Sequence, residues 1–367
     1  MRRTTPRFAW MAALLLVIGL VAAACGDDKD DASDSSDSTE TTAAPSGSFD
    51  YSALSGTLNG TGSSFQDAFQ QKARTEFGTV ASDVTVNYTK SGSSAGKQDL
   101  ANQVVQFAGT DSLIKDEDLP SFKGGDVLYF PIVAAPITIS YNLPGVDLKL
   151  SPGTIAGIFS ATITTWDADE IKADNPDADL PSTPIAVVHR SDGSGTTSNF
   201  TKYLTAAAGS DWTLGSGDTV PWPASTQGAE KNSGVATLIS TTEGAVGYVD
   251  LSDAVSADLQ LAEVENAAGK FVAPTLEAAS AALEGTAVEE DLTYDPLNAP
   301  GDKAYPITSP TWVIVYKTQP DAAVGDAIKS YLNFLLTDGQ GFANSVGYAS
   351  LPDDMVAKAI AQIDSIS

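Results

Sequence analysis

Residues 190–197, with the sequence RSDGSGTT, combine a positive charge with a run of small residues. Four apolar residues, 185–188, come just before and are typical of a buried strand, and the apolar residues within 198–204 recur at helical spacing. Backbone N–H groups converge at such a strand-to-helix turn, and a helix start carries partial positive charge. Arg190 adds a guanidinium fork that suits a tetrahedral oxyanion. The segment is interpreted as an anion-binding loop, although many Gly/Ser-rich turns bind nothing.

Two similar turns occur in the first third of the chain. Residues 60–65, GTGSSF, precede a helical pattern in which Ser64 is predicted as the N-cap, with Asp67 at the spacing of a capping box. Residues 84–88 alternate in polarity and predict a strand, and the small residues 92–96 then open a second helix. Each turn again joins the end of a strand or loop to a helix start.

Asp111 follows a third apolar run, residues 104–108, which predicts a strand. An isolated Asp in this position is commonly a helix cap or a turn former. Its functional alternative is an acceptor for a protonated ligand oxygen. The alternation of strands and helices predicts an α/β sheet, in which ligands gather beyond the carboxyl ends of the strands.

The first 25 residues indicate export. Residues 1–24 have a basic start, a short apolar stretch and small residues at the end, as in a signal peptide. Cys25 is the only cysteine, and its position resembles the lipobox of bacterial lipoproteins, in which that residue is acylated. Ordinary cleavage that leaves a free thiol is the alternative. We expect attachment to the cell membrane on its extracytoplasmic face, with residues 25–48, rich in Asp, Ser and Thr, as a disordered tether.

The amino-acid composition restricts the possible classes of function further. The formal net charge is −27, which argues against nucleic acid and anionic lipid head groups as partners. The length beyond residue 49 predicts two domains. With one histidine and one cysteine, a histidine-rich metal site is impossible and a Ser-His-Asp triad has only His189 available. No metal, cofactor or catalytic residue is predicted, and a phosphatase is the less favoured alternative.

Together these segments resemble the PstS-type phosphate-binding lipoproteins of bacterial phosphate ABC transporters. The resemblance runs from about Ser55 to the C-terminus and includes further motifs: residues 165–167, 175–176, 244–249, 305–307 and 348–352. It implies an α/β, two-lobed periplasmic-binding-protein fold of type II, with two hinge crossovers and a ligand cleft between the lobes. Lobe I would comprise residues 49–133 and 305–367, and lobe II residues 134–304.

The resemblance also implies a set of residues that hold dehydrated phosphate. Lobe I would supply Ser63, Ser64, Phe65, Ser93 and Asp111, and lobe II would supply Arg190, Ser194, Gly195 and Thr196. Asp192 is expected to pair with Arg190 and orient it, and Phe65 to contribute its backbone N–H. Ionised Asp111 only accepts hydrogen bonds, so it would favour phosphate, which keeps a proton near neutral pH, over sulfate, which has none.

The implied function is high-affinity phosphate binding by hinge closure in a monomer. Delivery to the permease and ATPase subunits of a phosphate ABC transporter would follow. The alternative from another class is an extracytoplasmic phosphate sensor or adhesion module on the same fold. Arsenate, which is nearly isosteric with phosphate and equally protonated, is not distinguished by the sequence.

Overall fold

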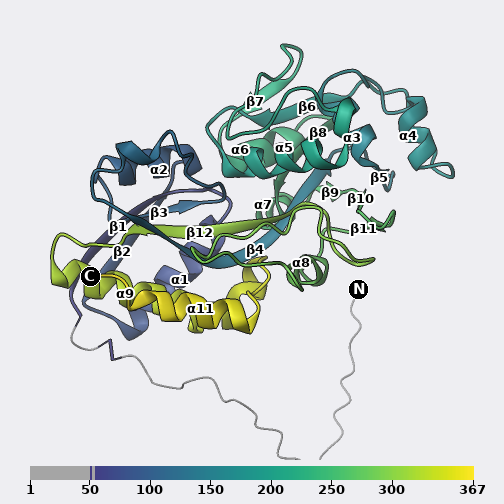
Figure 1. Cartoon of the computed structure of the whole chain (residues 1–367). Helices are drawn as coiled ribbons and strands as arrows, with labels where there is room; N and C mark the ends of the chain where they lie inside the picture. Colours follow the sequence, from purple (N-terminus) through teal and green to yellow (C-terminus); the bar gives the residue numbers. More distant parts are fainter. Residues whose placement is uncertain (1–49, 52–53) are drawn as a thin grey trace, which may run out of the picture. The chain divides into compact units, whose positions relative to one another are not determined.

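The computed structural model describes residues 50, 51 and 54–367 (Figure 1). Its strands are β1 (Gly56–Gly62), β2 (Val84–Lys90), β3 (Phe107–Thr110), β4 (Val127–Tyr141), β5 (Lys149–Leu150), β6 (Ala186–Arg190), β7 (Gln227–Ala229), β8 (Ala245–Asp250), β9 (Gln260–Leu261), β10 (Glu263–Glu265), β11 (Phe271–Val272) and β12 (Thr308–Tyr316). Its α-helices are α1 (Asp67–Val80), α2 (Ser93–Ala101), α3 (Pro152–Phe159), α4 (Asp169–Asp174), α5 (Gly195–Ala207), α6 (Lys231–Ser240), α7 (Leu251–Ser256), α8 (Leu276–Leu283), α9 (Ala322–Leu336), α10 (Asp338–Phe342) and α11 (Asp353–Ile363). Short 3₁₀ turns are η1 (Leu119–Ser121), η2 (Gly209–Asp211) and η3 (Ala343–Val346). The predicted signal peptide, lipidation site and tether lie outside the described residues.

One long sheet organises the described residues, with the strand order β2-β1-β3-β12-β4-β8-β6-β7 and β9 beside β4. A small sheet, β11-β10-β5, stands apart from it. In the first half β1 runs parallel to β2 and β3, and in the second half β6 runs parallel to β7 and β8. The central strands β12 and β4 are antiparallel to each other, and their crossing between the halves is visible in Figure 1.

Strand β4 changes partners along its length. Its residues 127–136 pair with β12, and residues 137–141 pair with β8. Pro136 stands at the change, and Pro131 lies beside a register irregularity in the pairing with β12. Proline has no N–H to donate to a neighbouring strand, so in sheets it is confined to edges, bulges and ends of pairing. The two prolines therefore mark where the ladder bends and where β4 passes from one half to the other.

The parallel strands of each half bring four loops to one region. In the first half, the residues after β1, β2 and β3 are Ser63, Ser91 and Asp111. In the second half, β6 ends at Arg190, and the loop that follows leads into α5. Carboxyl ends of parallel strands share one edge of a sheet, so the predicted site residues are presented together.

Some predicted boundaries were wrong. The first helix begins at Asp67 with Gln66 before it, so Ser64 is not its N-cap but lies in the loop. Gly78 was expected to end this helix, but the helix continues to Val80. Strand β3 begins at Phe107, while Val104 is exposed. Helix α5 begins at Gly195, three residues before the predicted start, and it is this difference that matters for the site.

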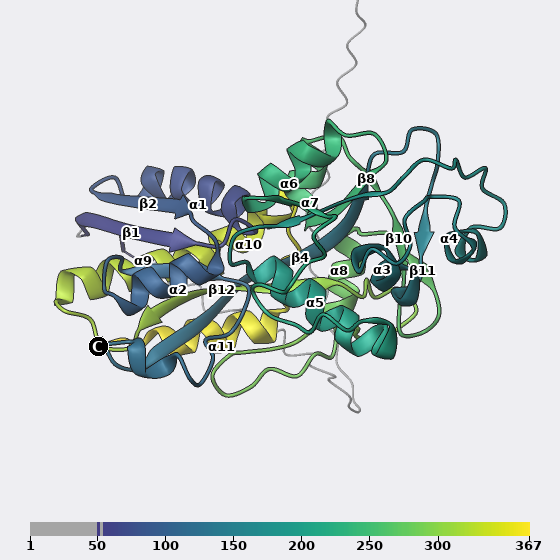
Figure 2. The ribbon, with the colours of Figure 1, turned by 90° about the horizontal axis from the view of Figure 1, so that it is seen from above.

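Apolar faces hold the helices on the sheet. In α1, Phe69, Ala73 and Phe77 lie on one face and are buried, and Phe77 packs edge-on against Tyr331 of α9. Figure 2 shows α1 and α9 near β1 and β2, with α5 beside the second half. Among the described residues, no helix is both long and apolar enough to cross a membrane.

Candidate anion-binding site

The loop after β1 is held by backbone and aromatic contacts. Ser63 N–H donates to the Gly109 carbonyl at 2.8 Å, and its own carbonyl accepts from the Tyr88 hydroxyl at 2.8 Å. The Phe65 ring is fully buried and packs edge-on against Tyr348. The Phe65 N–H, which was expected to contact the anion, instead donates to Ser63 Oγ at 3.0 Å in this structure. The loop is thus fixed from both sides, with Ser64 buried at its centre.

Asp111 lies within a ring of hydroxyl groups. Its Oδ2 accepts from Ser63 Oγ at 2.6 Å and from Ser93 Oγ at 3.3 Å, and its Oδ1 accepts from Thr311 Oγ1 at 2.6 Å. A carboxylate offers about four acceptor positions, so about one, on Oδ1, remains for a further donor. The hydroxyl of Ser63 is therefore engaged with Asp111.

Burial governs the charge of Asp111. Its side chain is almost wholly removed from solvent, and this burial raises the pKa of Asp111 to about 6. The hydrogen bonds from Ser63 and Thr311 and the nearby charge of Arg190 act in the opposite direction without cancelling it. Near neutral pH the carboxylate is mostly ionised and acts only as an acceptor.

In the second half, the N-terminus of α5 supplies the donors. Ser194 is the N-cap, and its side chain accepts from the Thr197 N–H at 3.2 Å. Gly195 and Thr196 are the first two residues of this 13-residue helix. The first amides of a helix have no partner within it and lie at the positive end of its dipole. The earlier start of α5 therefore places Gly195 and Thr196 where their N–H groups are free to donate.

Arg190 is buried and held in place from two sides. Its Nε and Nη2 donate to the two carboxylate oxygens of Asp192 at 2.7 and 2.6 Å, and its Nη1 donates to Asn232 Oδ1 at 3.0 Å. The expected Arg190–Asp192 pairing is thus present. A guanidinium has five N–H groups, so one on each Nη remains available, which is the pair that can grip an oxyanion.

Asp192 is itself surrounded by donors. Burial acts to raise the pKa of Asp192, but the hydrogen bonds and charge of Arg190, together with Lys231, more than offset burial and hold this pKa below its ordinary value. The Lys231 N–H donates to Asp192 Oδ1 at 3.1 Å, and its Nζ lies 3.5 Å from Oδ2. Asp192 therefore stays ionised and fixes the guanidinium of Arg190.

The two sets of residues touch one another. A Cβ added at Gly195 would lie 2.7 Å from both Asp111 Cβ and Ser93 Oγ, so only glycine fits there. The Ser94 N–H donates to the Gly193 carbonyl at 3.3 Å, and the Asn232 N–H donates to Ser64 Oγ at 3.2 Å. These contacts bring all nine predicted residues into one cluster.

Four backbone amides of the cluster are unpaired within the described part of the chain. They belong to Ser64, Ser93, Gly195 and Thr196. All four residues are buried, and buried N–H groups in proteins are nearly always paired. Four such donors beside the two free N–H groups of Arg190 form a site whose chemistry suits a small, multiply charged oxyanion.

Two participants were missed by the sequence reasoning. Thr311 in β12 donates to Asp111, and Asn232 in α6 contacts Arg190, Thr196 and Ser64. Neither stands in a small-residue turn, which was the signal used to find the others. His189, to which no role was given, is half-buried and stacks on Trp222 with ring centroids 4.8 Å apart.

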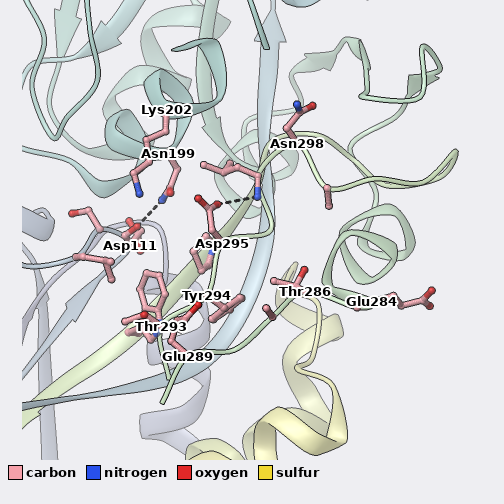
Figure 3. Close-up of a pocket in the computed structure, with 18 of the residues that line it drawn as sticks. Asp111, Asn199, Lys202, Glu284, Thr286, Glu289, Thr293, Tyr294, Asp295 and Asn298 are labelled. Atoms are coloured by element: carbon pink, nitrogen blue, oxygen red, sulfur yellow. Dashed lines mark hydrogen bonds between the residues drawn. The ribbon is translucent and has the colours of Figure 1, made fainter. Parts of the chain in front are cut away.

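A cavity of about 420 Å³ adjoins Asp111 (Figure 3). It is lined by Asn199, Lys202, Trp312 and parts of the segment 284–300, and Asn199 Nδ2 donates to the Asp111 carbonyl at 2.6 Å. Of the nine predicted residues only Asp111 lines it. This cavity therefore shares Asp111, and no other predicted site residue, with the donor cluster. Residues 50, 51 and 54–367 contain no group of three or more His, Cys, Asp or Glu placed to hold a metal ion.

Comparisons with known proteins agree with this architecture. A model of the PBP superfamily domain matches residues 38–339. The protein of Methanocaldococcus jannaschii named phosphate-binding protein PstS is 34% identical, over 83% of this chain and 85% of that protein. The protein of Mycobacterium tuberculosis named phosphate-binding protein PstS 3 is 32% identical, over 98% of this chain and 99% of that protein.

Among solved structures, that of a high-affinity periplasmic phosphate-binding protein, PfluDING, bound with phosphate, superposes with a TM-score of 0.70. It is 23% identical and covers 84% of this chain and 94% of that chain. This likeness confirms the predicted α/β periplasmic-binding-protein fold. The chain belongs to the PBP superfamily and, within it, to the family of PstS-type phosphate-binding proteins.

Proposed function

We propose that the chain binds inorganic phosphate at the cluster formed by Ser63, Ser64, Phe65, Ser93, Asp111, Arg190, Ser194, Gly195 and Thr196. The observation that carries the proposal is the group of buried, unpaired backbone amides at Ser64, Ser93, Gly195 and Thr196. They lie with the free N–H groups of Arg190, so the donors match an anion with several acceptor oxygens. The names of the relatives, all phosphate-binding proteins, support the same ligand.

Asp111 distinguishes phosphate from sulfate in this proposal. It already accepts three hydroxyl hydrogen bonds and keeps about one acceptor position on Oδ1. Monobasic or dibasic phosphate can donate its proton there. Sulfate has no proton, so it would set two acceptors against each other in a desolvated site, which is costly.

The site is shared by two lobes in this proposal, with residues 49–133 and 305–367 as lobe I and 134–304 as lobe II. The change of partner within β4 at Pro136 supports a hinge close to the first boundary. Closure over phosphate would bring donors from both lobes onto one ion. Release would require the lobes to part.

Delivery to a membrane permease and its ATPase subunits completes the proposed role, which is transport and not catalysis. The named relatives are binding proteins, and the PfluDING protein is described as periplasmic. We further propose that Cys25 carries the lipid that holds the chain at the outer face of the cell membrane, with residues 25–48 as its tether. The anchor would keep the binding protein within reach of the permease.

Equilibrium dialysis with labelled phosphate tests the proposal. We expect one phosphate per chain, and about 10- to 100-fold weaker binding by Arg190→Lys, which keeps the charge and loses the bidentate fork. The exposed Lys172→Ala serves as the control and should bind like the wild type. A wild-type chain that retains no phosphate, or an Arg190→Lys variant with unchanged affinity, would contradict the proposed site.

A further inference from the structure

Asn232 connects three of the proposed phosphate residues. It is fully buried near the start of α6. Its Oδ1 accepts from Arg190 Nη1 at 3.0 Å, and its Nδ2 donates to Thr196 Oγ1 at 3.3 Å. Its backbone N–H donates to Ser64 Oγ at 3.2 Å, across to the loop after β1.

The backbone before Asn232 is shaped for this contact. Lys231 has a φ of +64°, a left-handed conformation that is uncommon for a residue with a side chain. In this conformation the Lys231 N–H donates to Asp192 Oδ1, and the next N–H, of Asn232, reaches Ser64. The start of α6 therefore holds Arg190 in two ways: Lys231 fixes Asp192, which pairs with Arg190, and Asn232 accepts from Arg190 directly.

The direction of these hydrogen bonds decides what the hydroxyl groups can do. Ser64 Oγ and Thr196 Oγ1 both accept from Asn232, so the single proton of each hydroxyl is left to donate elsewhere. A deprotonated oxyanion oxygen can only accept. An Asn232 side chain that accepted from Thr196 would turn that proton away from the anion.

We propose that Asn232 is a positioning residue of the phosphate site, which sets Ser64 and Thr196 as donors and holds the free N–H groups of Arg190 toward the anion. The inference rests on the proposed phosphate binding and assigns to Asn232 no contact with phosphate itself. It predicts that the hydrogen-bonding character of the Asn232 side chain, beyond its volume, controls affinity.

Asn232→Ala and Asn232→Asp separate the hydrogen-bonding character of the side chain from its volume. Asn232→Asp keeps the shape but replaces the Nδ2 donor with an acceptor, so Thr196 would donate to it and no longer to phosphate. We expect phosphate binding, measured by calorimetry, to weaken about 10- to 100-fold in Asn232→Ala and further in Asn232→Asp. Asn175→Ala is the matched control, because Asn175 is also buried and makes three hydrogen bonds, but to Lys149 and Ile171 around α4 and β5.

A double-mutant cycle with Thr196→Val distinguishes positioning from general destabilisation. If Asn232 acts partly through the Thr196 hydroxyl, Asn232→Asp should lose several-fold less affinity in the Thr196→Val background than in the wild type. Additive losses, or an Asn232→Asp protein that binds like the wild type, would overturn the inference while leaving phosphate binding intact. A wild-type chain that binds no phosphate would overturn both. If Asn232→Asp does not fold, Asn232→Ser replaces it, with at least tenfold weaker binding expected and wild-type affinity as the contradicting result.

Discussion

At the scale of single residues, burial and hydrogen bonding have different effects on the Asp111 carboxylate. Burial raises its pKa to about 6, while three hydroxyl donors hold its carboxylate in one orientation. The charge is thus available near neutral pH, and the remaining acceptor position is directed by Ser63, Ser93 and Thr311. A group with these properties selects for a ligand that carries a proton.

The first prediction concerns selectivity. Asp111→Asn introduces an amide that can donate to sulfate, so the ratio of phosphate to sulfate affinity should fall by about tenfold or more. Competition of sulfate against labelled phosphate measures this ratio in wild type and variant. A variant that rejects sulfate as strongly as the wild type would remove Asp111 from the selectivity argument.

The second prediction concerns pH. Between about pH 4 and pH 6 the folded, unliganded chain retains a proton on Asp111 that the unfolded chain has released, so the free energy of unfolding should fall as pH rises through this window. The contribution is at most about 3 kcal/mol for this shift. Urea unfolding of the wild type and of Asp111→Asn at several pH values isolates it. The difference in unfolding free energy between the two proteins should change across the window, and a constant difference would contradict the raised pKa.

At the scale of helices and strands, α5 shows what the sequence could predict. The apolar spacing after residue 198 indicated a helix, but the spacing cannot mark a start built from small polar residues. The real start lies at Gly195, because Ser194 caps the helix and the tight contact with Asp111 and Ser93 excludes any side chain there. In contrast, the apolar residues within 322–336 recur at helical spacing over the whole of this segment, which predicts a helix with the bounds that α9 has.

The predicted site residues share one local signal, a small-residue turn after a strand or before a helix. Thr311 lies inside the buried strand β12 and Asn232 inside the first turn of α6. Their roles depend on which elements pack together, since Thr311 is 200 positions from Asp111 and Asn232 is 168 positions from Ser64. No local pattern carries that information.

The third prediction concerns the contact between α2 and the loop before β7. Lys97 Nζ lies 3.0 Å from Asp218 Oδ2, which also accepts from Ser94 Oγ at 2.7 Å. Both charged side chains are mostly buried, at 15% and 17% exposed. If closure of the lobes retains phosphate, Lys97→Ala should increase the dissociation rate of phosphate about 2- to 10-fold and change its association rate little. The reason is that the loss of contacts in the bound state acts mainly on dissociation.

Stopped-flow displacement of phosphate measures these rates. The matched control is Lys115→Ala, because the Lys115–Glu117 pair is 67% and 75% exposed and contributes little. Equal dissociation rates for Lys97→Ala and Lys115→Ala would show that the Lys97–Asp218 pair does not restrain opening.

At the scale of the whole molecule, a strongly acidic chain presents a local site for an anion. The formal net charge is −27, yet unpaired amides, the N-terminus of α5 and the buried Arg190 set the field at the cluster. Salt screens the long-range repulsion between the acidic surface and an anion, whereas the hydrogen-bond donors of the cluster contact the anion directly. The net charge therefore argues against nucleic acid as a partner without arguing against phosphate.

The fourth prediction concerns the anchor. Cys25→Ala removes the only thiol, so the chain should pass from the membrane fraction to the soluble extracytoplasmic fraction and lose incorporation of labelled fatty acid. Cell fractionation and fatty-acid labelling measure both effects, with Ser36→Ala in the tether as the control. Incorporation of labelled fatty acid into the Cys25→Ala chain, or no incorporation into the wild type, would contradict lipidation at this residue.

The central claim is that the donor cluster between β1, β3 and α5 selects phosphate. Its most direct test is a calorimetric titration of the purified protein, stripped of bound ligand, with phosphate and then with sulfate. We predict tight one-to-one binding of phosphate and no heat with sulfate. Sulfate binding as strong as phosphate binding, or no binding of either ion after confirmed removal of ligand, would contradict the account.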